Sequence, residues 1–91
     1  MSAGKRHSAS RFDLELDLHG LSAEDAIRKL DDTVYKASPS SVLIIHGKGD
    51  GVLRRAVRRH LAEQEYVREI VNGEDFNYPG EAGVTIFYTR G

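Results

Sequence analysis

The 91-residue sequence contains no cysteine, no tryptophan and only two prolines. Without cysteine the chain can form neither a disulfide framework nor a thiolate metal site, so we expect a cytoplasmic protein. Long apolar runs are missing as well. The longest, Val42 to Ile45, has four residues, whereas a membrane-spanning helix needs about 20. We therefore expect no membrane partner.

The length is sufficient for one small domain with a single core of modest size. We expect residues 11–91 to form this domain and, taken alone, to be a monomer. Residues 1–10 are polar and basic and lack the apolar stretch of a signal peptide. We interpret them as a disordered tail or a remnant of cloning.

Charge is unevenly distributed although the net charge is only −1. The segment from His46 to His60 holds five basic residues and one acid, whereas the segment from Ser22 to Asp32 holds four acids and two bases. Binding to a polyanion depends on local charge more than on the total. The asymmetry therefore favours nucleic acid as a partner.

The pattern of apolar residues predicts four strands and two helices. Strict alternation predicts a half-buried strand over 12–19, and a run that is apolar on both faces is typical of a central strand. The predicted elements are a strand at 12–19, a helix at 22–37, a strand at 42–45, a helix at 52–64 and strands at 67–71 and 84–88. This order predicts an α/β fold, a two-layer βαβαββ sandwich with a mixed four-stranded sheet and both helices on one face.

The same dipeptide, His-Gly, follows each of the first two predicted strands, as His19-Gly20 and His46-Gly47. If the two strands are parallel, both histidines emerge at the same edge of the sheet, where ligands of open α/β sheets bind. With an unperturbed pKa of about 6.5, one neutral and one protonated imidazole can serve as base and acid. Asp17 lies on the same strand face as His19 and would orient an imidazole, act as a base or hold a divalent cation.

A glycine-rich segment, Gly47-Lys48-Gly49-Asp50-Gly51, leads into the second helix. Glycines allow tight turns and close approach to a ligand, and the free amides of a helix N-terminus favour an anion. The spacing matches neither a Walker loop nor a dinucleotide fingerprint. A phosphate site is one interpretation, and a plain glycine-rich connector is the other.

The second predicted helix carries four arginines with no interleaved acid, Arg54, Arg55, Arg58 and Arg59. Such a ladder on a solvent-facing side either confers solubility or binds a phosphate backbone, and mutual repulsion favours binding. His60 falls in the apolar stripe of the helix and is interpreted as a core histidine with a satisfied hydrogen bond. Phe76 and Tyr78 would stack on unpaired bases or fold back over the sheet, and we favour the second.

Together these residues resemble the two signature motifs of the Smr (small MutS-related) domain. The motifs are Leu16-Asp17-Leu18-His19-Gly20 before one helix, and Ile45 to Gly49 followed by Gly51-Val52-Leu53-Arg54 at the start of the next. The resemblance extends from Phe12 to Tyr88 and includes the Gly83-Val84-Thr85 opening of the last strand. Two features depart from the family pattern, a short connection between the first helix and the second strand and a long loop over 74–82.

The resemblance implies a fold similar to the C-terminal domain of bacterial translation initiation factor 3. It also implies nicking or endonuclease activity on DNA or RNA, in DNA repair or recombination or in ribosome rescue, which makes the ribosome a further candidate partner. Carried over by motif position, Asp17, His19 and His46 are the catalytic candidates. The residues expected at the phosphate are Gly47, Lys48, Gly49, Gly51, Arg54, Arg55 and Arg58.

We therefore expect an endonuclease that works by acid–base chemistry at the paired His-Gly turns. No metal or other cofactor is required in this scheme, and a Mg²⁺ ion held by Asp17 is the alternative. A module that binds nucleic acid or the ribosome without cleaving it is the rival function. A third possibility is a fragment whose specificity depends on other domains.

Overall fold

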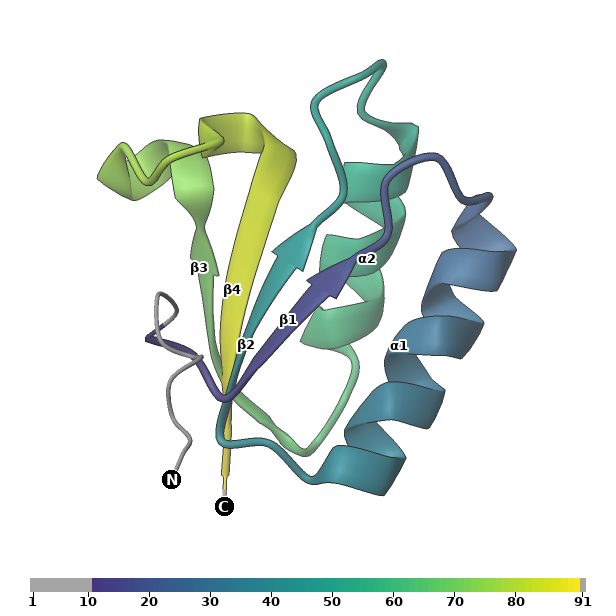
Figure 1. Ribbon diagram of the computed structural model, residues 1–91, viewed down its shortest axis with the longest axis vertical. Coiled ribbons are helices and arrows are strands. Elements are labelled where there is room, and N and C mark those ends of the chain that lie inside the picture. Colours follow the sequence, from purple (N-terminus) through teal and green to yellow (C-terminus); the bar gives the residue numbers. More distant parts are fainter. Residues whose placement is uncertain (1–10, 91) are drawn as a thin grey trace, which may run out of the picture.

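The computed structural model describes residues 11–90 of the chain, which fold into a four-stranded sheet covered by two α-helices (Figure 1). Two short 3-10 helices, η2 and η3, connect the last two strands. In chain order the elements are β1 (Leu14–Asp17), α1 (Ala23–Ala37), β2 (Ser41–Ile45), α2 (Val52–Ala62), β3 (Val67–Asn72), η2 (Gly73–Phe76), η3 (Glu81–Gly83) and β4 (Val84–Thr89). The predicted order βαβαββ is confirmed.

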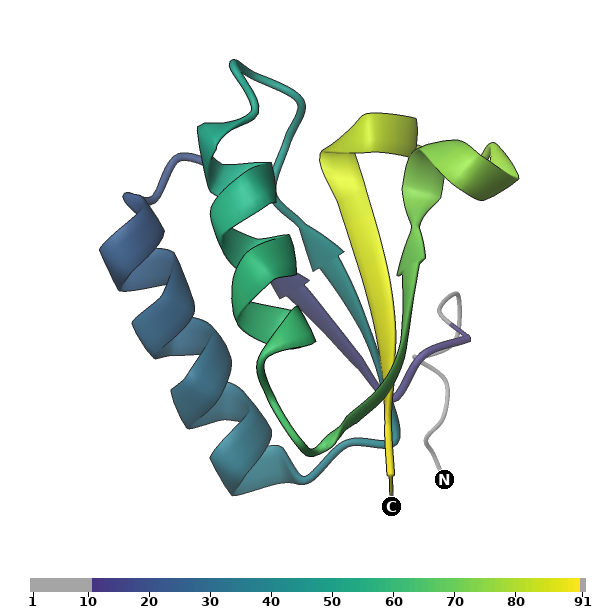
Figure 2. The same cartoon turned by 180° about the vertical axis from the view of Figure 1, so that it is seen from behind.

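The strands are arranged in the order β1-β2-β4-β3. β1 pairs with β2 in parallel, with Asp17 opposite Ile45, and β4 runs antiparallel to both β2 and β3. Both helices lie on the same face of the sheet (Figure 2), as expected. Because β1, β2 and β3 run in the same direction, the segments that follow them, 18–22, 46–51 and 73–83, share one edge. We call it the loop edge.

The two helices begin differently. Ser22 caps α1, since its Oγ accepts a hydrogen bond of 3.1 Å from the Asp25 amide. α2 begins at Gly51, which has φ +86° and offers no side-chain cap. α2 also ends at Ala62, earlier than the predicted Gln64, because the Glu63 and Gln64 amides bond carbonyls three residues back. In the described part of the chain, neither helix has the length and apolarity to cross a bilayer.

Apolar side chains fill both faces of the central strands. The larger cluster lies between sheet and helices and consists of Leu16, Leu18, Ala26, Leu30, Val42, Ile44, Val57, Leu61, Val67 and Phe87. A smaller cluster on the other face consists of Leu43, Val84 and Ile86, with Phe12, Ile45, Val71, Tyr78 and Tyr88 packed against it. β2 is therefore buried on both faces, as its sequence predicts.

Phe12 departs from its predicted position. Alternation over a strand from 12 to 19 would put Phe12 on the face of Leu14, Leu16 and Leu18, but β1 begins only at Leu14, and Phe12 packs on the opposite face. There its ring meets Tyr78 edge-on, with centroids 6.1 Å apart. Tyr78 thus folds back over the sheet as we favoured, whereas Phe76 is 66% exposed.

We predict that Phe87→Ala destabilises the domain by about 3–5 kcal/mol, because Phe87 is fully buried at the centre of the larger cluster and its removal leaves a cavity. Tyr35→Ala is the control. Tyr35 is 85% exposed, and its loss is expected to change stability by at most about 0.5 kcal/mol. Urea denaturation measures both values, and equal effects of the two substitutions would contradict this account of the core.

Candidate active site

His19 and Asp17 form a hydrogen-bonded pair at the end of β1. The Nδ1 atom of His19 lies 2.5 Å from Oδ1 of Asp17, and the His19 backbone amide donates to the same oxygen at 3.1 Å. These hydrogen bonds from His19 hold the pKa of Asp17 below its usual value, so Asp17 is a carboxylate and Nδ1 carries the hydrogen. Nε2 of His19 is then the free ring nitrogen of a side chain that is 68% exposed.

His46 is placed very differently. The residue is only 4% exposed, and both of its ring nitrogens have protein partners. Nδ1 lies 3.0 Å from the carbonyl oxygen of Gly47, which can only accept, and Nε2 lies 2.8 Å from Oγ1 of Thr85. Burial lowers the pKa of His46 below its ordinary value, which favours a neutral imidazole. The two histidines share an edge, but only His19 faces solvent.

Arg58 does not lie on the solvent-facing side of α2, contrary to the ladder interpretation. Its side chain is 18% exposed and forms a two-bonded pair with Glu74, with N–O distances of 2.9 and 2.8 Å. Nε donates to Oγ1 of Thr85 at 2.7 Å, and Nη2 also donates to the Val84 carbonyl. Arg58 follows Arg54 by one helical turn. Its side chain nevertheless points toward β4, where it contacts Thr85 and Val84.

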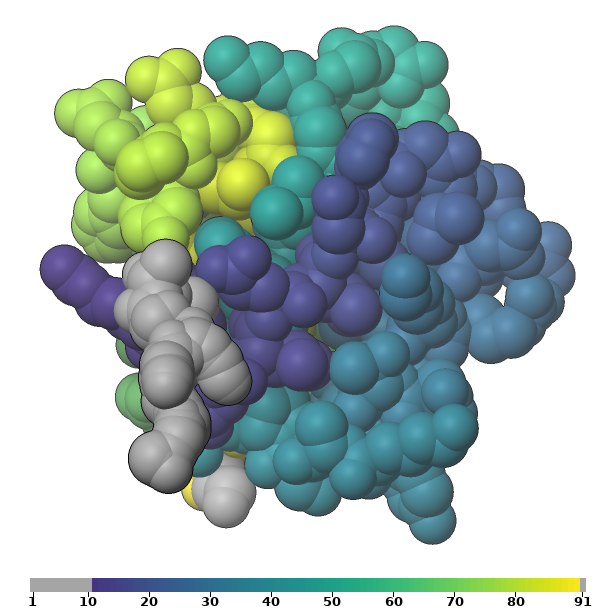
Figure 3. All heavy atoms as spheres, viewed as in Figure 1, coloured from purple at the N-terminus to yellow at the C-terminus, as the bar shows by residue number. Residues whose placement is uncertain are grey.

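The glycine-rich loop lies directly beside His19. A Cβ built on Gly47 would be 3.6 Å from Cβ of His19, and Gly47 has φ +81°, which favours glycine. The amides of His46 and Gly47 both donate to the carbonyl oxygen of Gly83, at 3.0 and 2.9 Å. In the space-filling view the turn after β1 and the loop after β2 adjoin at the surface (Figure 3).

Positive charge gathers where α2 begins. The guanidinium groups of Arg54 and Arg55 lie over Gly51, 2.7 and 2.9 Å from where its Cβ would be. No acid occupies the first turn of α2, whereas Glu24 and Asp25 occupy that of α1. Lys48 is exposed on the same loop. The helix dipole and these cations favour an anion at this end of α2, where Oδ1 of Asp50 accepts from the Val52 amide at 3.0 Å.

His60 satisfies its hydrogen bonding away from this site. Its Nε2 lies 2.7 Å from Oδ1 of Asp31, and the pair links the two helices. This geometry agrees with the interpretation of His60 as a satisfied histidine. In residues 11–90 no cluster of three or more histidines and acids offers a ready metal site.

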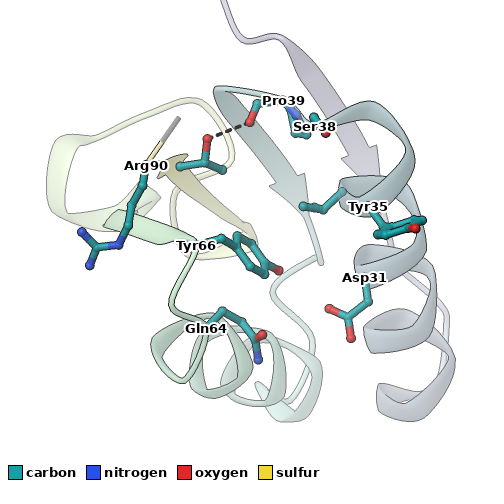
Figure 4. A pocket seen from close by; sticks show the side chains of 9 residues that line it. Asp31, Tyr35, Ser38, Pro39, Gln64, Tyr66 and Arg90 are labelled. Carbon is teal, nitrogen blue, oxygen red and sulfur yellow. Dashed lines mark hydrogen bonds between the residues drawn. The ribbon is translucent and has the colours of Figure 1, made fainter.

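A pocket of about 600 Å³ opens at the opposite end of the sheet (Figure 4). Tyr66 lines it, and in the described chain the buried hydroxyl of Tyr66 has no hydrogen-bond partner. The other lining residues are Asp31, Val34, Tyr35, Ser38, Pro39, Gln64, Thr89 and Arg90. None of them belongs to the His-Gly turns, so the site indicated by the sequence and this pocket are separate.

The sequence did not single out Glu74 as part of this edge. Glu74 is 16 residues from Arg58 along the chain and belongs to a loop without any motif. The sequence pointed to Gly83 and Thr85 only through the resemblance of Gly83-Val84-Thr85 to the closing segment of the family. Their roles depend on β4 lying next to β2, which no local pattern encodes.

Comparisons with known proteins agree with this geometry. The family model "Smr domain" matches residues 16–90. Endonuclease MutS2 of Caldicellulosiruptor bescii is 40% identical over 78 residues, which are 82% of this chain and 10% of that protein. Endonuclease MutS2 of Clostridium acetobutylicum is 43% identical over 74 residues, 78% of this chain and 9% of that protein. The chain thus spans about a tenth of the length of these relatives.

Two solved structures have the same fold. The crystal structure of the Smr domain of Thermus thermophilus MutS2 is 32% identical, with a TM-score of 0.75, and the match covers 85% of this chain and 98% of that one. YdaL, a stand-alone small MutS-related protein from Escherichia coli, has a TM-score of 0.67 at 23% identity, covering 85% of this chain and 64% of that one. The second likeness is one of fold alone.

We predict that Glu74→Gln destabilises the protein above about pH 5 and less as the pH falls. The hydrogen bonds from Arg58 lower the pKa of Glu74 from 4.5 to about 2. The charged pair therefore stabilises the fold above the unfolded-state pKa, and this stabilisation is lost as the pH falls toward about 2. Urea unfolding of both proteins across this pH range measures the difference.

Glu69→Gln is the matched control. Glu69 lies 3.7 Å from Arg68, and both side chains are more than half exposed. Such a pair contributes only about 0–1 kcal/mol. A destabilisation by Glu74→Gln that stayed constant with pH, or that Glu69→Gln matched, would contradict the assignment.

Proposed function

Because the chain belongs to the Smr domain family, we propose that it is an endonuclease that cleaves phosphodiester bonds of nucleic acid at the loop edge. The observation that carries the proposal is the Asp17–His19 pair, which leaves one imidazole nitrogen free in solvent beside the glycine-rich loop. A carboxylate that fixes the tautomer of a histidine is the usual arrangement for a general base.

On RNA, Nε2 of His19 would take the proton of a 2′-hydroxyl group. The 2′ oxygen then attacks the phosphorus, the bond from phosphorus to the 5′ oxygen breaks, and the products are a 2′,3′-cyclic phosphate and a 5′-hydroxyl end. The departing oxygen would take its proton from water or from the Lys48 ammonium group at this exposed edge. Asp17 would stabilise the imidazolium that forms.

The phosphate would be held where α2 begins. Arg54, Arg55 and Lys48 offer positive charge there, whereas the first amide of α2, that of Val52, already donates to Oδ1 of Asp50 at 3.0 Å. In the described chain the amides of Lys48 and Gly49 donate to no protein group. Such donors would stabilise the charge that develops on the phosphorane.

Two rival functions use the same edge. In a metal-assisted route Asp17 would hold Mg²⁺ through its second oxygen, together with the substrate phosphate, and water would be the nucleophile. In a non-cleaving module the cations would supply affinity alone. Because His46 is buried, it is not free to act as the acid in a mechanism with two catalytic histidines. This burial favours the non-cleaving module over that two-histidine mechanism.

We predict that His19→Ala and Asp17→Asn each reduce cleavage of single-stranded RNA by about 10²–10⁴-fold, because each removes part of the general base. His60→Gln is the histidine control, since His60 bonds Asp31 away from the edge, and its activity is expected to match the wild type. Product ends are determined on a defined oligonucleotide, with EDTA present and with a 2′-deoxy nucleotide at the cut site.

The outcomes separate the three functions. Cleavage that persists in EDTA, stops at the 2′-deoxy position and leaves a cyclic phosphate supports the proposed route. Cleavage that is lost in EDTA but indifferent to the 2′-deoxy group indicates the metal-assisted route. Salt-dependent binding with no turnover would indicate the non-cleaving module.

We also predict that Arg54→Ala and Arg55→Ala each lower the affinity for nucleic acid and reduce the slope of log affinity against log salt by about 1. Lys36→Ala is the control, because Lys36 pairs with Asp32 on α1 at 3.2 Å and lies outside the loop edge. Fluorescence anisotropy at several salt concentrations measures both quantities. An unchanged slope in the arginine variants would refute the location of the phosphate.

A further inference from the structure

The hydroxyl group of Thr85 joins two groups that the sequence assigned to separate tasks. Thr85 is fully buried in β4, and its Oγ1 lies within hydrogen-bond distance of both Arg58 Nε and His46 Nε2. A guanidinium can only donate, so Thr85 accepts from Arg58. Its own hydrogen is then available to Nε2 of a neutral His46, whose Nδ1 donates to the Gly47 carbonyl.

Arg58 donates outward to Glu74 and inward to Thr85, and from Arg58 the donors run in one direction through Thr85 and His46 to the Gly47 carbonyl. We call this chain of hydrogen bonds the relay. Its outer end is the Glu74 carboxylate, 38% exposed, and its inner end is the backbone of the glycine-rich loop. Every polar atom of the relay thus obtains a partner without water, which such a buried network requires.

A second set of contacts holds the same loop. The Gly83 carbonyl accepts from two successive amides, those of His46 and Gly47. A Cβ on Gly83 would lie 3.3 Å from the carbonyl carbon of Gly47, so glycine permits this close approach. The segment at the start of β4 therefore holds Gly47 twice, through the backbone of Gly83 at the end of η3 and through the relay at Thr85.

We propose that Thr85 is a positioning residue for the proposed endonuclease: through His46 it fixes Gly47 against His19 and so sets the loop that would face the phosphate. This inference rests on the proposed function. His46, in this account, acts through the loop and does not exchange protons with the substrate.

Arg58 has a different expected role from Arg54 and Arg55, because only Arg58 belongs to the relay. Glu74 neutralises its charge, and its donors are directed to Glu74, Thr85 and the Val84 carbonyl. Arg54 and Arg55 make no ion pair in the described chain and lie over the loop. Loss of the relay is therefore expected to lower turnover, whereas loss of Arg54 or Arg55 lowers affinity.

The test compares Thr85→Val, which replaces the hydroxyl by a methyl group of similar size, with Thr85→Ser, which keeps the hydroxyl and loses the methyl group. A misplacement of about 1 Å can cost about 100-fold in rate, so we expect kcat for RNA cleavage to fall at least about tenfold in Thr85→Val. Affinity and salt slope are expected to stay those of the wild type. Thr85→Ser is expected to retain most of the activity.

Thr89→Val is the matched control on the same strand. The Thr89 hydroxyl donates to the Pro39 carbonyl at 2.8 Å, at the far end of β4 beside the pocket (Figure 4). The substitution removes one hydroxyl from β4 without touching the relay. Its kcat is expected to equal that of the wild type.

A second readout does not need turnover. Hydrogen exchange of the Gly47 amide, followed by NMR, is expected to be about tenfold faster in Thr85→Val and unchanged in Thr89→Val, because local opening sets that rate. Unchanged exchange, or unchanged kcat with a cleaving wild type, overturns the positioning role. A wild type that does not cleave refutes the proposed function, and the exchange comparison still decides the relay.

Should Thr85→Val fail to fold, Glu74→Gln loosens Arg58 from the exposed end of the relay. It is expected to shift both readouts in the same direction by a smaller factor. If neither kcat nor Gly47 exchange moves in Glu74→Gln, the relay does not position the loop.

Discussion

The parallel pairing of β1 with β2 is the constraint on which the rest of the edge depends. The ladder from Leu14–Val42 to Asp17–Ile45, continued by the Leu18 amide bonding the Ile45 carbonyl, brings the two strand ends to one place. An antiparallel pairing of the same residues would put His19 and His46 at opposite ends of the sheet. A parallel pair needs a crossover, which α1 supplies, and so the helix with its Ser22 cap is part of the reason that a site exists.

β4 then makes the two His-Gly turns unequal. It inserts next to β2, so that Thr85 and Gly83, the residue just before β4, contact the second turn, while the first turn follows the edge strand and its imidazole bonds Asp17. One imidazole is consequently held by two partners in the interior, and the other is held by one partner in solvent. The same dipeptide thus serves two physical purposes, set by the strand next to it.

Much of this could be predicted from the sequence. The order of elements, the parallel pair and the edge shared by the His-Gly turns follow from periodicity and spacing, which are local properties. The burial of His46 could not be predicted, because it depends on Thr85, 39 residues further on. Likewise Arg58 has the same local pattern as Arg54, and only the distant Glu74 distinguishes them. Phe12 was misplaced because alternation does not mark where a strand begins.

β4 is both a central strand of the sheet and the last of the described strands in chain order. A nascent chain that has released β1, α1, β2 and α2 already contains Asp17, His19, Arg54 and Arg55, but the loop between β2 and α2 still lacks its bonds to Gly83 and Thr85. The partners of that loop, Gly83 and Thr85, leave the ribosome only with the final strand. The order of synthesis therefore keeps the loop edge incomplete until β4 has emerged, so the proposed site is assembled late in the synthesis of the domain.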